Sequence, residues 1–205
     1  MKSFSLYEFS GILIPGAMIL FGIALIFPEI ERVLLKDISL GDLGLFVLLA
    51  YAAGQIIQAI GNILENLWWK LNKGMPTNWI RIGKGGLLSP EQIKILEDQI
   101  STKLSIKLKD GIRGTDAQNW YGITRHLYAY VGNRGKTDRI EIFNAYYGLN
   151  RGMYASLAVL TVLILIFSDN KFAWITAMLA GIALYRMHRF AKNYARELFV
   201  QFLES

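Results

Sequence analysis

The longest uncharged stretch of the chain constrains its fold most. Residues 43–64 contain no Asp, Glu, Lys or Arg, which is enough residues for a helix to cross the hydrocarbon core of a bilayer. Glu65 follows this stretch, and Trp68, Trp69 and Lys70 come just after it. Aromatic and charged residues of this kind are typical of the point where a span leaves the membrane. We therefore predict a transmembrane helix here.

Three amide side chains interrupt this apolar stretch. Gln55, Gln58 and Asn62 are separated by three and four residues, so they share one face of a helix. An amide in hydrocarbon is costly unless it hydrogen-bonds to a neighbour or to water. The face therefore contacts either another helix or a water-filled path. Both interpretations, helix packing and pore lining, remain open at this point.

Three shorter apolar runs accompany the long one, at 9–28, 152–168 and 172–185. The last run has only fourteen residues between Lys171 and Arg186, which is short for a span. It crosses the membrane if the following arginines extend their charges to the headgroups; otherwise it stays within one leaflet. The fold class that we predict is an α-helical membrane protein with four transmembrane helices.

The region between the second and third spans has a different character. Helix starts are predicted at Ser89, which precedes a proline, at Thr115 or Asp116, and at Thr137 or Asp138. Residues 103–109 alternate between apolar and polar side chains, which favours a strand. This insert is therefore expected to be small and mainly helical, with an α+β fold left open. The predicted domains are two spans in 1–70, the insert in 71–150, two spans in 151–185 and a tail helix in 186–205.

The distribution of positive charge predicts the topology. If four helices cross, nineteen of the 22 Lys and Arg residues lie on the side of the termini and the insert. The other side holds only Arg32, Lys36 and Lys171. The positive-inside rule then places both termini and the insert in the cytoplasm. The basic amphipathic tail is expected to lie on the membrane surface or to pack on the insert.

The insert itself is basic and rich in aromatic residues. From Lys70 to Arg151 it holds fourteen Lys and Arg against seven acidic residues. Such a charge favours attraction to anionic headgroups beneath the membrane. Basic residues interleaved with aromatic ones also suit a ligand with phosphates and flat bases, whereas a nucleic-acid partner is not expected. The candidate ligand-binding residues are Trp120, Arg125, Tyr128, Arg134 and Lys136.

Two places join the insert to the spans, and any signal from the insert must pass through them. One is Trp68-Trp69, and the other is Asn150-Arg151. We predict that Glu65 and Arg151 form an ion pair between them, although simple anchoring at the membrane surface explains the same residues. Pro15 lies near the middle of the first run, where it kinks a helix and serves as a gate or a packing device. The predicted gating or joint residues are Pro15, Glu65, Trp68, Trp69, Asn150 and Arg151.

Composition and spacing argue against an enzyme. The chain has no cysteine, and its two histidines, His126 and His188, lack the spacing of metal ligands. Arg125-His126 has no carboxylate cluster or serine motif near it in the sequence. We expect no catalytic residues, no metal and no cofactor.

Several short motifs carry a resemblance to known proteins. They are Tyr-Glu-Phe-Ser-Gly at 7–11, Pro15-Gly16, the Ala-Tyr-Ala-Ala-Gly-Gln stretch at 50–55, and residues 143–152. With these motifs the chain resembles small bacterial inner-membrane proteins, and in design the membrane effectors of anti-phage systems such as CBASS. In those systems a cytosolic part responds to a nucleotide messenger and the spans disrupt the inner membrane. The resemblance implies no individual ligand-binding residue here.

Two functional hypotheses follow. The first is a homo-oligomeric effector of the bacterial inner membrane, whose insert receives a cytosolic signal, such as a cyclic nucleotide, and whose spans permeabilise or depolarise the membrane in antiviral defence. The second is a non-conducting scaffold that recruits a cytosolic protein partner through the insert and tail.

Overall fold

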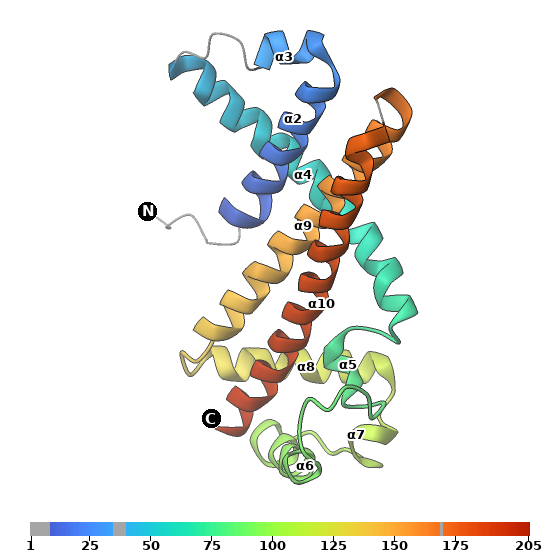
Figure 1. Cartoon of the computed structure of the whole chain (residues 1–205). Helices are drawn as coiled ribbons and strands as arrows, with labels where there is room; N and C mark the ends of the chain where they lie inside the picture. The colour runs from blue at the N-terminus through green and yellow to red at the C-terminus, as the bar shows by residue number, and fades with distance from the viewer. Residues whose placement is uncertain (1–8, 35–39, 169) are drawn as a thin grey trace. The chain divides into compact units, whose positions relative to one another are not determined.

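A computed structural model describes residues 9–34, 40–168 and 170–205, and its regular structure is helical throughout, with no strand among these residues. The helical part of the predicted fold class is confirmed, whereas its four membrane spans stay a prediction. The residues Tyr7 and Glu8 of the first motif lie outside the described ranges. In chain order (Figure 1) the elements are η1 (Phe9–Leu13), α2 (Ile14–Ile26), α3 (Pro28–Leu34), α4 (Leu40–Leu71), α5 (Pro76–Trp79), α6 (Pro90–Leu104), α7 (Gly111–Gly114), α8 (Ala117–Gly132), α9 (Asp138–Phe167), η2 (Asn170–Phe172) and α10 (Ala173–Leu203).

The chain divides into two compact units. Unit 1 comprises Met1–Leu67 and Ala145–His188, and unit 2 comprises Trp68–Asn144 and Arg189–Ser205. The three long helices α4, α9 and α10 each contribute residues to both units. Most of the predicted tail, Arg189–Ser205, belongs to unit 2 together with most of the insert, whereas residues 186–188 belong to unit 1.

Two of the described helices are long and apolar enough to span a membrane by length and composition. The first is α4, whose apolar part begins at Leu43, and the second is α9. Only 22% of the most apolar window of the first is buried within the protein. Most of its apolar side chains are therefore exposed, as those of a lipid-facing helix would be. The first run forms a shorter apolar helix, Gly11–Ile26.

Small residues allow the helices of unit 1 to approach closely. A Cβ atom at Gly16 in α2 would overlap the carbonyl oxygen of Ala50 in α4, and one at Gly54 would overlap that of Ile12. Close backbone contact at small residues is the usual way in which membrane helices pack. Beside this crossing, a buried cluster of Ile19, Ile57, Ala155 and Leu160 unites α2, α4 and α9.

Unit 2 is built from capped helices around the C-terminal half of α10. The Ser89 capping box is formed, and Asp116 caps α8 by accepting from the backbone N–H groups of Gln118 and Asn119. Trp120 of α8 stacks on Phe199 of α10 with their ring centres 6.2 Å apart. Leu198, Phe199 and Phe202 are at most 1% exposed. Of the two interpretations of the tail, packing on the insert is the one that the structure shows.

The strand predicted for residues 103–109 is wrong. Helix α6 continues to Leu104 and ends where Ser105 adopts a left-handed conformation, with φ of 58°. The following residues belong to no helix or strand and alternate in exposure, with Ile106 and Leu108 half-buried and Lys107 exposed. The alternation therefore reflects a segment with one side against the core, and the described residues include no strand with which it could pair.

The structure adds a detail at the junction of the insert with the third apolar run. The helix expected to begin at Thr137 or Asp138 and the span expected from Gly152 are one helix, α9. Its two glycines, Gly148 and Gly152, lie within the helix and do not end it. An isolated glycine in a helix costs only about 1 kcal/mol relative to alanine, so packing against neighbours overrides it.

Candidate functional site

Gln58 of α4 forms the buried polar centre of unit 1, and it is only 7% exposed. Its Oε1 atom accepts hydrogen bonds from Nε and Nη2 of Arg151, at 3.1 and 2.8 Å. Its Nε2 atom donates to the carbonyl oxygen of Gly148 at 3.3 Å and to that of Gly11. Gln58 therefore joins η1, α4 and α9, with the full hydrogen-bonding capacity of its amide in use.

The carbonyl oxygen that Gln58 reaches in η1 is free because of a proline. Pro15 has no N–H group, so it cannot donate to the carbonyl four residues earlier, which belongs to Gly11. Away from water, that oxygen needs another donor, and Gln58 supplies it. The carbonyl of Pro15 in turn accepts from Ser156 Oγ at 2.9 Å. A π-helical turn, η1, comes directly before α2, which has Pro15 in its first turn. The kink and the gating role predicted for Pro15 stay predictions.

The ion pair predicted between Glu65 and Arg151 is formed. Arg151 Nη1 lies 2.7 Å from Glu65 Oε2, and each side chain is 14% exposed. The same guanidinium lies 5.9 Å from the ring centre of Tyr147. A charged pair held this far from water depends on both partners, because either one alone would remain as a buried charge. The pair thus fixes α4 against α9, and its role in gating stays a prediction.

Asn150, the other predicted joint residue beside Arg151, is 4% exposed. Its Nδ2 atom donates to the Tyr146 carbonyl oxygen at 2.7 Å, and its Oδ1 atom accepts from Arg186 Nε at 3.2 Å. It therefore ties α9 to α10 within unit 1.

The two other amides of the predicted face, Gln55 and Asn62, lie outside this centre. Gln55 and Asn62 are exposed, and neither side chain hydrogen-bonds to another described residue. They belong to a line of small and amide residues with alternating spacings of three and four, all of them exposed. We call this line the amide ridge; it consists of Ala52, Gln55, Ala59, Asn62 and Asn66.

The predicted aromatic pair at the end of the span belongs to unit 2. Trp69 is 4% exposed, and its ring meets that of Trp79 edge-on, with centres 6.3 Å apart. Its carbonyl oxygen accepts from the N–H of Gly74 at 2.8 Å. Trp68 is half-buried. Trp69 therefore packs in the core of unit 2, and its role as a joint to the spans stays a prediction.

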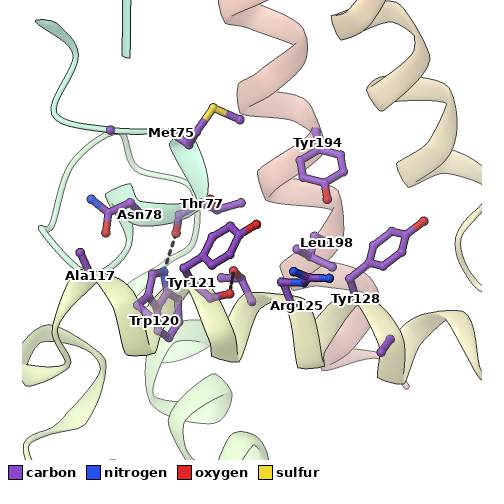
Figure 2. A pocket seen from close by; sticks show the side chains of 13 residues that line it. Met75, Thr77, Asn78, Ala117, Trp120, Tyr121, Arg125, Tyr128, Tyr194 and Leu198 are labelled. Carbon is purple, nitrogen blue, oxygen red and sulfur yellow. Dashed lines mark hydrogen bonds between the residues drawn. The ribbon is translucent and has the colours of Figure 1, made fainter. Parts of the chain in front are cut away.

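Three of the five predicted ligand-binding residues line one cavity of unit 2, about 630 Å³ in volume. They are Trp120, Arg125 and Tyr128 of α8 (Figure 2). Trp120 forms part of the wall, because it is 1% exposed and its Nε1 donates to the Thr77 carbonyl oxygen at 2.8 Å. Arg125 and Tyr128 are more accessible.

The other two predicted ligand-binding residues lie elsewhere. Lys136 Nζ donates to the carbonyl oxygen of Glu204 at 2.8 Å, and Lys103 Nζ donates to that of Phe202 at 3.2 Å. These lysines satisfy the free carbonyl groups at the end of α10, a common role for cations. Arg134 stacks on Tyr130, with its guanidinium carbon 3.6 Å from the centre of the ring. Burial, together with the charges of Arg134 and Lys136, lowers the pKa of Lys103.

Sequence reasoning missed several residues of the cavity, above all Tyr121 and Tyr194. Tyr121, Arg125 and Tyr128 are spaced by four and three residues, so their shared face could have been found from helical periodicity. Tyr194 comes from a distant part of the chain and carries no such signal. His126 lines a different cavity from its neighbour Arg125, because consecutive helical residues point in different directions.

Comparison with protein families, with characterised proteins and with solved structures finds no match to this chain.

Proposed function

We propose that this protein is a homo-oligomeric effector of the bacterial inner membrane, in which copies meet through the amide ridge of α4 and permeabilise the bilayer. Unit 2 receives the cytosolic signal that controls this activity. The observation that carries the proposal is the ridge itself. Gln55 and Asn62 lie exposed, with no described hydrogen-bond partner, inside the longest uncharged stretch of the chain.

The chemistry of an exposed amide in a membrane helix favours self-association. Its N–H and carbonyl groups need partners, which lipid tails do not offer. A second ridge offers matching amides, and the alanines between them let two helices approach closely. In a ring of copies, amides that do not pair with each other face water, which is the condition for a conducting path.

The neighbouring face of α4 differs from the ridge and supports a lipid contact. Ile56 and Ile63 are 65% and 70% exposed, and each directly follows a ridge amide in the sequence, about 100° further around the helix. Leu45, Leu49 and Leu67 continue this apolar face. A polar ridge beside a purely apolar face supports a helix that touches protein on one side and lipid on the other.

The proposal includes four crossings, with η1 and α2, α4, α9, and the first part of α10 as the spans. Nineteen of the 22 positive residues then share the cytoplasmic side with the insert. The resemblance to anti-phage effectors supports a role in defence. The scaffold that recruits a cytosolic partner is the alternative, and the experiment below separates the two.

The test compares membrane depolarisation in bacteria that express the wild-type chain and two variants at equal levels in the membrane fraction. We expect the wild type to depolarise the cells and Gln55→Leu/Asn62→Leu to lose most of this effect. The control Ile56→Leu/Ile63→Leu changes the adjacent apolar face and should behave as the wild type. Equal depolarisation by the ridge variant would remove the ridge from any conducting role. A wild type that captures a partner without depolarising cells would support the scaffold.

A further inference from the structure

The cavity of unit 2 is assembled from three segments of the chain. Residues 74–78 form one side, α8 forms the floor, and Tyr194 and Leu198 of α10 close it (Figure 2). Its volume of about 630 Å³ falls within the range of ordinary small-molecule sites. Trp120 and Leu198 are each 1% exposed, so these walls are fixed by the packing of unit 2.

Aromatic rings surround the open part of the cavity. Tyr121 and Tyr128 are 64% and 37% exposed, and Tyr194 approaches them from α10 (Figure 2). Burial raises the pKa of Tyr194, and the nearby phenols of Tyr128 and Tyr121 raise it further. The hydroxyl group of Tyr194 therefore lies near those of Tyr128 and Tyr121. They offer flat apolar faces together with hydrogen-bonding groups.

One cation faces this space without an acidic partner. Arg125 is exposed and forms no ion pair with any residue in the described part of the chain. Its guanidinium lies 6.0 Å from the ring centre of Tyr121. None of the described residues that line the cavity is acidic. A guanidinium in such surroundings is suited to a phosphate, which it can bind through two parallel hydrogen bonds.

We propose that this cavity binds a nucleotide, with the base against the tyrosine rings and a phosphate on Arg125. Aromatic side chains stack on any base, and the tyrosine hydroxyl groups can bond to ribose or phosphate oxygens. Lys136 and Lys103 are not part of the site, because they bond to backbone carbonyl groups at the end of α10. The binding of a nucleotide in this cavity does not depend on the proposed function. Only the further step, that the nucleotide is the signal for the membrane spans, rests on the proposed function.

The test measures binding by isothermal titration calorimetry with the full chain in detergent micelles. The probes are the four ribonucleoside 5′-monophosphates, 3′,5′-cyclic AMP, cyclic di-AMP, adenosine and inorganic phosphate. We expect at least one nucleotide to bind more tightly than both adenosine and phosphate, because the site holds a ring and an anion together. Arg125→Gln should weaken that nucleotide about tenfold and leave adenosine within about twofold, and Tyr121→Leu should weaken both.

The matched control is Arg134→Gln, which removes an arginine of the same charge that also stacks on a tyrosine but lies outside the cavity. It should bind the nucleotide as the wild type does. Unchanged thermal unfolding of each variant shows that a loss of binding is not a loss of fold. The proposal is overturned if no nucleotide binds, if phosphate alone binds as tightly, or if Arg125→Gln and Arg134→Gln have equal effects. If a nucleotide binds but the wild-type chain does not depolarise cells, the result contradicts the proposed function and leaves the nucleotide site in place.

Discussion

Gln58 shows how much a single polar residue can organise in an apolar unit. It fills the gap that Pro15 leaves in η1 and holds Arg151, which in turn holds Glu65. The spacing of Gln55, Gln58 and Asn62 predicted a shared polar face. It could not predict that the middle amide is buried and the outer two exposed, because that depends on where η1 and α9 pack.

We expect Gln58→Leu to destabilise the protein by about 2 kcal/mol, because it leaves a buried carbonyl group and part of Arg151 without partners. This effect is measured by thermal unfolding in detergent, with the loss of a monodisperse peak in size-exclusion chromatography as the signal. Gln118→Leu is the matched control and should unfold near the wild-type temperature, since the exposed side chain of Gln118 lies outside the amide ridge and bonds to no described residue. Equal stability of the two variants would contradict the structural role of Gln58.

The phenols of unit 2 predict a loss of stability in alkali. Burial raises the pKa of Tyr128 and Tyr194 above the ordinary value of 10.0. Above pH 10.0 the folded chain thus keeps phenol protons that the unfolded chain releases. The stability that these two tyrosines contribute is therefore complete below pH 10.0, and it is lost as the pH rises through their pKa values in the folded chain. Unfolding temperatures of the wild type should fall more steeply above pH 10 than those of Tyr128→Phe/Tyr194→Phe. Parallel curves would show that these phenols do not titrate differently on folding.

At the scale of elements, the crossing of α2 and α4 depends on glycine. We expect Gly16→Ala to destabilise unit 1 by about 1–3 kcal/mol, because the new methyl group would overlap the Ala50 carbonyl oxygen and push the helices apart. Gly44→Ala, in open space on α4, should instead be neutral or stabilise by up to about 1 kcal/mol. The unfolding temperatures of both variants check this, and a harmless Gly16→Ala would mean that the two helices do not touch there.

Local signals predicted the elements well where the chemistry is local. Ser89 and Asp116 cap helices as expected, since a cap involves only neighbouring residues. The strand at 103–109 failed because pairing needs a second strand, which the pattern of one segment cannot supply. The helix predicted from Thr137 or Asp138 towards the membrane joins the third apolar run as one helix, α9, which continues through Gly148 and Gly152.

At the scale of the whole molecule, composition and charge predicted a helical protein with apolar spans and a basic insert. The cavity was only partly predictable, because Tyr194 and Thr77 reach it from distant parts of the chain. The amide ridge needed the structure as well. Periodicity alone cannot tell an exposed amide from one that is already satisfied, and on this distinction we base the proposal that copies meet at the ridge.

Crosslinking of single cysteines tests that claim most directly. The natural chain has no cysteine, so Gln55→Cys, Asn62→Cys, Ile56→Cys and Ile63→Cys each carry one thiol. After mild oxidation in isolated membranes, we expect disulfide-linked dimers for the two ridge positions and far fewer for Ile56→Cys and Ile63→Cys. Equal crosslinking at all four positions, or dimers at the isoleucine positions only, would contradict self-association through the amide ridge.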